Sequence, residues 1–281
     1  MSIQPHTLEE ITPNYKVFLF DIWGVLHNGI HALPGAIEIV DSLQDQGKLV
    51  LAVSNSMRDS VFLSNHFKSM GIKIAPEFIF SSGDTCREYL NEHGGTIFQI
   101  GTDYGGDLLQ GLDIEVVDSI EKAQSIILTT YIYDIENLGK YDDLLKQAVK
   151  RDLLALCPNP DIMAMHGDKY HYCPGAIAKR YEDMDGRTIY FGKPYKPIFE
   201  SAYRHACDLI PGLQKSDVIM FGDTLETDIR GANEMGFDSA LMLTGIVGKT
   251  LNLKDDAANL AGIIELDEFH KFPPNWILVG F

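Results

Sequence analysis

The chain has 281 residues, of which 40 are acidic and 23 basic, giving a formal net charge of −17. This length is enough to bury one large hydrophobic core or two modest ones, and we expect two domains. Lysine and arginine form no dense block, which argues against a nucleic-acid partner. The acidity is typical of a soluble, self-repelling surface.

The N-terminal sequence has no basic segment followed by an apolar stretch, and no run in the chain approaches about 18 apolar residues. We therefore expect no membrane partner and a cytoplasmic location. The four cysteines are widely spaced, without the CxxC pairs or neighbouring histidines of a zinc site, and are predicted to be buried thiols.

The first predicted strand covers residues 16–20 and ends in an acid. Asp21 follows four consecutive apolar residues and precedes Gly24, which places it at the carboxyl end of a strand, where open α/β sheets bind their ligands. An isolated aspartate at this place more commonly caps the next segment. Its role therefore depends on how the other strands end.

A helix is predicted after Pro34, and Gly47 is placed to end it. Its apolar positions recur at helical spacing: Ile37, Val40 and Leu43. Residues 49–53 form the next apolar strand, which stops at Ser54, Asn55 and Ser56. Two strands thus end in polar side chains.

Residues 84–185 have their own alternation of strands and helices, long enough for a small α/β domain. We interpret this stretch as an insertion, with residues 1–83 and 186–281 forming the main domain. The pattern of the main domain returns with a strand at 188–191, followed by Gly192 and Lys193. A further strand at 218–221 ends at Gly222 and Asp223. The fold class is α/β, with a mostly parallel sheet flanked by helices.

Four strands are therefore predicted to end in Asp21, Ser54-Asn55, Lys193 and Asp223, and the carboxyl ends of parallel strands meet at one edge of a sheet. Two carboxylates in one pocket repel each other unless a cation lies between them, and Mg²⁺ prefers oxygen ligands. Lys193, Ser54 and backbone N–H groups supply the charge and donors that a phosphate requires. Asp21 would then attack phosphorus.

These segments resemble the haloacid dehalogenase superfamily of phosphotransferases, specifically its class IIA members, which carry an α/β cap in mid-chain. Asp21 in DIWGVLHNG falls on the nucleophile motif, and Ser54 and Asn55 in VSNS on the phosphate-binding motif. Lys193 in GKP falls on the third motif. The metal motif, GDTLETD, contributes Asp223 and Asp228. The resemblance implies a Rossmann-like core, a cap at 84–185, and Mg²⁺ held by Asp21, the Trp23 carbonyl, Asp223 and Asp228.

One position departs from the family's pattern. Its phosphatases usually carry a second aspartate two residues after the nucleophile, as acid to the leaving group and base to water, and here that residue is Trp23. An indole cannot transfer the proton, and general acid–base catalysis contributes roughly 10²–10⁴-fold. His27, Asn28 and Asp134 are the candidates for a substitute, although each is more commonly a structural or solvated loop residue.

The segment CPNPD at 157–161 resembles the turn that leads from the cap towards the core in class IIA enzymes. Its first role is that of a rigid turn, and Asn159 and Asp161 are additional candidates for substrate contact.

The leading hypothesis is Mg²⁺-dependent hydrolysis of a small phosphate monoester, of the sugar phosphate or pyridoxal phosphate type. Two alternatives remain open: cleavage of a carbon–halogen or carbon–phosphorus bond, and a phosphate- and metal-binding protein whose catalysis was lost with Trp23. The expected partner is a small phosphorylated substrate, and the sequence leaves a homo-oligomer open.

Overall fold

The computed structural model describes residues 6–101, 108–133, 135–166, 169–244 and 266–281. The chain divides into two compact units. The first comprises Met1–Ser54, Ser60–Phe80 and Lys193–Phe281, and the second comprises Asn55–Asp59 and Ser81–Gly192. The predicted domain limits, after 83 and after 185, differ from these limits by a few residues, and the short segment 55–59 groups with the second unit.

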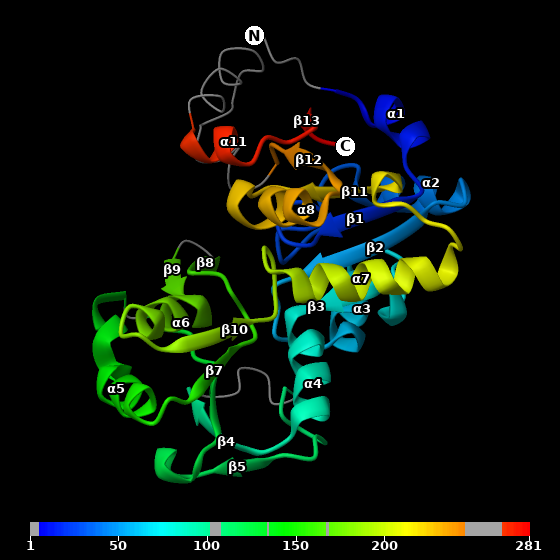
Figure 1. The fold of residues 1–281 in the computed structure, drawn as a ribbon. Helices are drawn as coiled ribbons and strands as arrows, with labels where there is room; N and C mark the ends of the chain where they lie inside the picture. The colour runs from blue at the N-terminus through cyan, green and yellow to red at the C-terminus, as the bar shows by residue number, and fades with distance from the viewer. Residues whose placement is uncertain (1–5, 102–107, 134, 167–168, 245–265) are drawn as a thin grey trace. The chain divides into compact units, whose positions relative to one another are not determined.

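The first unit is built on a six-stranded sheet with the order β13-β12-β11-β1-β2-β3 (Figure 1). The pairs from β13 through β2 are parallel. The strands are β1 (Val17–Asp21), β2 (Leu49–Ser54), β3 (Ile79–Ser81), β11 (Val218–Gly222), β12 (Asp238–Met242) and β13 (Trp276–Leu278).

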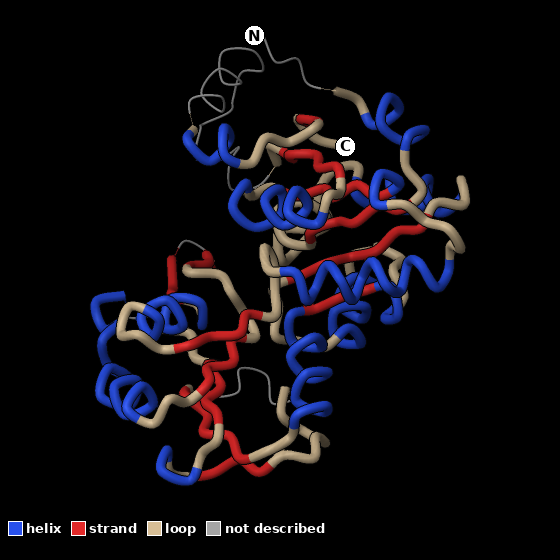
Figure 2. The backbone as a smooth tube through the Cα atoms, in the orientation of Figure 1, coloured by secondary structure: helices blue, strands red, loops and turns tan. Residues whose placement is uncertain are grey.

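Helices cover both faces of this sheet (Figure 2). They are α1 (Leu8–Ile11), α2 (Ala36–Asp45), α3 (Ser60–Ser69), α7 (Lys196–Leu209), α8 (Arg230–Met235) and α11 (Asp267–Lys271). Short 3₁₀ turns lie at Thr12–Asn14, Pro76–Phe78 and Lys215–Asp217, and a π-helical turn at Leu225–Ile229.

The strand β1 shows why both faces are covered. Its side chains alternate between the two faces of the sheet. Phe18 and Phe20 belong to the core that includes residues of α2 and α3, whereas Val17 and Leu19 belong to the core that includes residues of α7 and α8. All five residues of the strand are buried, and the first four, Val17 to Phe20, form the continuous apolar run that a strand covered on both faces requires.

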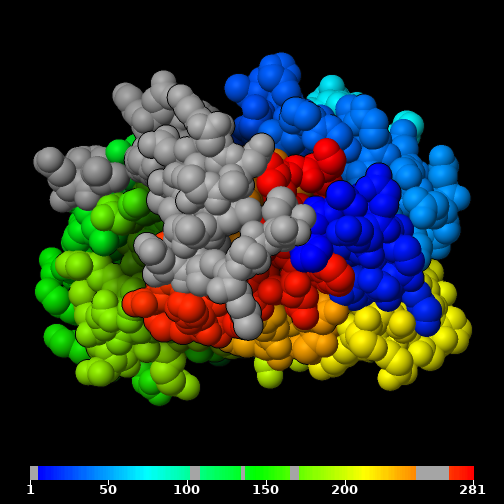
Figure 3. Space-filling view, turned by 90° about the horizontal axis from the view of Figure 1, so that it is seen from above, coloured from blue at the N-terminus to red at the C-terminus, as the bar shows by residue number. Residues whose placement is uncertain are grey.

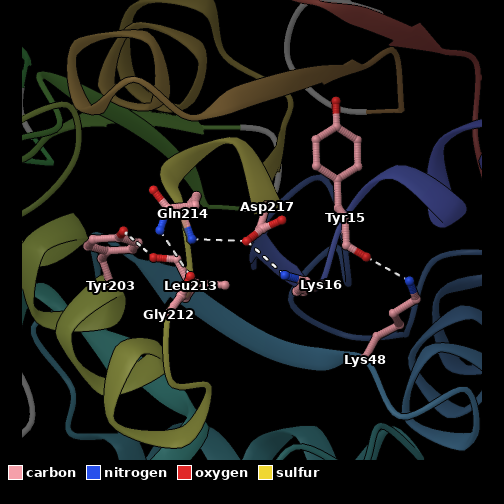
Figure 4. Close-up of polar contacts among 8 residues, drawn as sticks. All are labelled: Tyr15, Lys16, Lys48, Tyr203, Gly212, Leu213, Gln214 and Asp217. Atoms are coloured by element: carbon pink, nitrogen blue, oxygen red, sulfur yellow. Dashed lines mark hydrogen bonds and ion pairs between the residues drawn. The ribbon is translucent and has the colours of Figure 1, made fainter.

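The two chain ends of the first unit lie against each other. The backbone N–H of His6 donates to the carbonyl of Ile277 in β13 at 2.8 Å. Figure 3 shows the blue N-terminal residues beside the red C-terminal segment. At the amino ends of the central strands, Lys16 pairs with Asp217, and Lys48 donates to the carbonyl of Tyr15 (Figure 4).

The second unit has its own five-stranded sheet, with the order β10-β7-β6-β4-β5, in which all pairs are parallel. An antiparallel pair, β8 and β9, completes its strands. They are β4 (Thr96–Ile100), β5 (Glu115–Val117), β6 (Ser125–Leu128), β7 (Leu154–Cys157), β8 (Met163–His166), β9 (Lys169–Tyr172) and β10 (Arg187–Tyr190). The helical segments are α4 (Ser82–His93), α5 (Asp142–Lys150), α6 (Pro174–Glu182), and 3₁₀ turns at Ile120–Lys122 and Ile135–Tyr141.

The α/β fold class is confirmed, but one strand was assigned to the wrong sheet. The strand predicted at 188–191 was expected to belong to the main sheet, and β10 instead pairs with β7 in the sheet of the second unit. Hydrophobic patterning identifies a strand without identifying its partner, because both sheets bury similar apolar runs. Among the described residues, no helix is long and apolar enough to cross a membrane.

Candidate active site

Two adjacent parallel strands bring two acids together at the carboxyl edge of the first unit's sheet. Phe20 of β1 is paired with Phe221 of β11, so Asp21 ends its strand beside the end of β11, and Asp223 follows that end directly. Asp21 and Asp223 are both buried, and Asp223 is only 2% exposed. This is the juxtaposition that the two apolar runs predicted.

Asp228 reaches the same place from the π-helical turn Leu225–Ile229. The N–H of Ile229 donates to the carbonyl of Thr224 at 3.3 Å, five residues earlier, and Asp228 Oδ2 accepts from the N–H of Thr224 at 3.2 Å. A Cβ at Gly222 would collide with the Asp228 carboxyl group. The glycine of GDT therefore allows this carboxylate to approach the strand end closely.

The three carboxylates form one cluster. Asp21, Asp223 and Asp228 each offer an oxygen, and these oxygens all lie within 4.8 Å of one another. π-Helical turns of this kind occur frequently at functional sites. The cluster brings together the three side chains that the sequence predicts as metal ligands.

Lys193 is the cation of this cluster. Its ammonium group forms an ion pair with Asp21 and a second with Asp228 Oδ1 at 2.7 Å, and the side chain is 3% exposed. Burial alone would lower the pKa of Lys193, but the charges of Asp21 and Asp228 outweigh that effect and hold this pKa above its usual value. Lys193 therefore stays charged. It does not follow a strand of the six-stranded sheet, because the preceding strand, β10, pairs with β7 in the second unit.

Burial and mutual repulsion make the carboxylates difficult to ionise together. Burial raises the pKa of Asp21 to about 6, with Lys193 opposing the shift and Asp223 adding to it. Burial likewise raises the pKa of Asp228 to about 7, with Lys193 opposing and Asp21 adding. Among the described residues, the three buried carboxylates and the Lys193 ammonium group carry an excess of negative charge, which a divalent cation with oxygen ligands would neutralise. The donor set fits Mg²⁺.

The two predicted phosphate-binding residues at the end of β2 belong to different units. Val53 is paired with Asp21, so Ser54 is the next residue of the neighbouring strand. Asn55 groups with the second unit, where its Nδ2 donates to Asp161 Oδ1 at 2.8 Å. Asp161 is in turn held by its own N–H, which donates to Asn159 Oδ1 at 2.9 Å. The NPD segment is therefore a hydrogen-bonded turn.

The loop after β1 does not present an obvious substitute for the missing acid. His27 is buried, and its Nδ1 accepts from the N–H of Gly29 at 2.9 Å. Burial is the main cause that lowers the pKa of His27 to about 4, and the neighbouring His66 lowers it further. Asn28 Oδ1 accepts from the N–H groups two and three residues later. Both side chains shape the loop, and Asp134 lies outside the described residues.

Sequence reasoning missed two features of this site. The close approach of Asp228 depends on Gly222, and its carboxylate is oriented by the N–H of Thr224. The signal for both was the GDT triplet itself, in which a glycine precedes the acid. The π-helical turn had no sequence signal that we recognise.

Comparison with known proteins places these features in a family context. Residues 18–115 match the family model described as haloacid dehalogenase-like hydrolase, and residues 190–264 match one described as HAD-hydrolase-like. The two matches contain all seven predicted site residues.

Similar proteins and structures cover most of the chain. It is 27% identical to chronophin of Bos taurus, over 85% of this chain and 84% of that protein. It is 25% identical to an acid sugar phosphatase of Staphylococcus epidermidis, over 83% and 88% of the respective chains. A crystal structure of a haloacid dehalogenase-like hydrolase from Brucella suis 1330 matches 99% of this chain and 100% of its own, with a TM-score of 0.81 and 29% identity.

Proposed function

Because the chain belongs to the haloacid dehalogenase-like hydrolases and is a phosphatase of that superfamily, we propose that it hydrolyses a small phosphate monoester with Mg²⁺, through an aspartyl phosphate on Asp21. The cluster of Asp21, Asp223 and Asp228 around Lys193 is the observation that carries this proposal. Such a cluster would be superfluous in a metal-free carbon–halogen hydrolase.

Mg²⁺ would be held by Asp21, the backbone carbonyl of Trp23 and Asp223, with Asp228 orienting its water ligands. When bound, the ion would neutralise charge on the phosphate oxygens. Its presence would also favour the ionised form of the buried carboxylates, because a nearby opposite charge lowers the pKa that burial has raised.

The remaining roles belong to the chain's own side chains. The Asp21 carboxylate would form a bond to phosphorus as the bond from phosphorus to the ester oxygen breaks, and the ester oxygen would leave as an alkoxide that takes its proton from solvent water. An ionised carboxylate needs no base for this step, and phosphoryl transfer depends mainly on positioning and charge neutralisation. Lys193 supplies positive charge beside Asp21, and Ser54 and Asn55 supply phosphate donors. Water would then attack phosphorus and lose a proton to solvent as the bond between phosphorus and Asp21 breaks, which releases the Asp21 carboxylate and inorganic phosphate.

The second unit is proposed to act as a cap that closes over the substrate and excludes water. A cap favours compact substrates, and the names of the relatives point the same way: one is an acid sugar phosphatase and another a ribonucleotide monophosphatase. We therefore propose a sugar phosphate, pyridoxal phosphate or nucleoside monophosphate as the substrate.

A panel of phosphate monoesters, assayed with and without Mg²⁺, tests this function. We expect release of phosphate that requires the metal and is lost in Asp21→Asn. Asp41→Asn is the matched control, because Asp41 forms a surface ion pair with Lys73. Tight binding of phosphate and Mg²⁺ without turnover of any ester would instead identify a binding protein.

A further inference from the structure

Trp23 is a large apolar side chain left exposed two residues after the proposed nucleophile. Its neighbours Ile22, Val25 and Leu26 are buried, whereas Trp23 is 48% exposed. Large apolar residues exposed beside a site often contact its ligand.

The indole is held in place by its own loop. Atoms Cζ3 and Cη2 of Trp23 occupy the space where a Cβ on Gly29 would lie, and Gly29 has φ +93°, a conformation that favours glycine. The ring also meets His27 edge to face, with centroids 5.8 Å apart, and the N–H of Gly24 donates to the His27 carbonyl at 2.9 Å. A ring fixed before binding loses little conformational entropy when a ligand packs on it.

This indole is one end of a continuous row of rings. His27 contacts His66 edge to face at 5.4 Å, and His66 stacks on Phe62 at 6.4 Å. Phe62, on α3, is 43% exposed. The loop after β1 and the start of α3 therefore expose aromatic surface at both ends of the row, Trp23 and Phe62.

From this arrangement we propose that Trp23 is a specificity-determining residue that packs against the alcohol portion of the substrate and selects phosphate monoesters whose alcohol carries an aromatic or heteroaromatic ring. This inference rests on the proposed function and narrows its substrate class. Aromatic side chains bind rings through offset or edge-to-face packing, and the gain over an aliphatic group of similar size corresponds to roughly threefold to tenfold in affinity.

The test compares benzyl phosphate with cyclohexylmethyl phosphate, whose alcohols are similar in acidity and size. The wild-type protein should favour the benzyl ester in kcat/KM by roughly threefold to tenfold, mainly through KM. Trp23→Leu should remove this preference and Trp23→Phe should retain most of it. Leu209→Ala, at another exposed apolar residue, should keep the wild-type ratio. An unchanged ratio in a folded Trp23→Leu protein would overturn the inference.

A binding measurement separates this inference from the proposed function. The chain has two tryptophans, so Trp276→Phe leaves Trp23 as the only indole reporter. Benzylphosphonate, which cannot be hydrolysed as an ester, should change its fluorescence at roughly threefold to tenfold lower concentration than cyclohexylmethylphosphonate. This preference without hydrolysis of any ester would support the inference and refute the phosphatase proposal. Ester hydrolysis with equal affinity for both phosphonates would do the reverse.

Discussion

Replacing Trp23 by aspartate should convert a slow phosphatase into a faster one. The substitution restores the proton-transferring carboxyl group that related phosphatases carry two residues after the nucleophile. We expect kcat for an alkyl phosphate to rise by roughly 10²-fold, the lower end of the range for general acid–base catalysis, because the surrounding loop is built around an indole. An alkyl ester shows the effect best, since its poor leaving group most needs a proton.

The stability cost of this substitution can be derived from the exposure of the indole. Trp23 is 48% exposed, so about 100 Å² of its side chain is buried in the folded protein. Removing that surface should lower the free energy of unfolding by about 2 to 3 kcal/mol. Domains typically have about 5 to 15 kcal/mol of stability, so the variant should remain folded. Denaturation with urea measures the loss.

Steady-state and rapid-quench kinetics on one alkyl and one aryl phosphate provide the assay. Trp23→Asn is the matched control, because it removes the same indole and supplies no proton-transferring group. The wild-type protein should accumulate phosphoprotein after a burst on the aryl ester, and Trp23→Asp should not. Equal turnover by the aspartate and asparagine variants would refute the reasoning. So would wild-type hydrolysis of the alkyl ester at about 10 s⁻¹ or more, since another residue would then supply the proton.

Three further predictions follow from the charges in the first unit. Lys193→Met should lower the free energy of unfolding by about 3 to 5 kcal/mol in denaturation without metal, because it leaves two buried carboxylates without their cation. Asp223→Asn should weaken Mg²⁺ binding by roughly tenfold or more in calorimetric titration, because it removes a charged ligand from the cluster. Burial lowers the pKa of His27 to about 4 in the folded protein, against 6.5 for an ordinary histidine. The free energy of unfolding should therefore fall by about 2 kcal/mol when the pH is lowered from 7 to 5, because the unfolded chain binds the proton first. Unfolding at the two pH values, compared with His27→Gln, isolates that contribution.

Each of these predictions has a control or a result that would contradict it. Lys16→Met removes an exposed ion pair with Asp217 at 3.1 Å (Figure 4) and should cost at most about 1 kcal/mol; a similar loss for Lys193→Met would contradict the first. Unchanged Mg²⁺ affinity in Asp223→Asn would contradict the second, with Asp41→Asn as the control. The third fails if wild type and His27→Gln lose equal stability on acidification.

The sequence predicted which side chains meet at the edge of the sheet better than it predicted which strands bring them there. Asp21 and Asp223 could be placed together because each follows an apolar strand and parallel strands end at one edge. Lys193 was expected by the same reasoning, but the preceding strand, β10, pairs with β7 in the other sheet. Hydrophobic periodicity indicates which side chains of a strand are buried, but it does not indicate which other strand pairs with it. Only the tertiary structure shows that Lys193 forms ion pairs with Asp21 and Asp228.

The hydrophobic pattern of the sequence also does not predict where a side chain approaches the backbone closely. Gly222 and Gly29 both allow a neighbouring side chain to occupy the place of a Cβ, the Asp228 carboxyl group in one case and the Trp23 indole in the other. In the sequence each is simply a glycine in a loop or at a strand end. The physical requirement becomes visible only when the neighbour is known.

Trp23 connects the two proposals made for this protein. The same side chain would explain both a slow turnover, for lack of a proton-transferring group, and a preference for esters of aromatic alcohols. The indole cannot transfer a proton, and it offers a partly exposed apolar surface two residues after the proposed nucleophile. Trp23→Asp should therefore raise turnover of alkyl esters and at the same time abolish the preference for the benzyl ester over the cyclohexylmethyl ester. If turnover rises while the preference persists, the aromatic selectivity resides elsewhere, and Phe62 is then the first residue to replace.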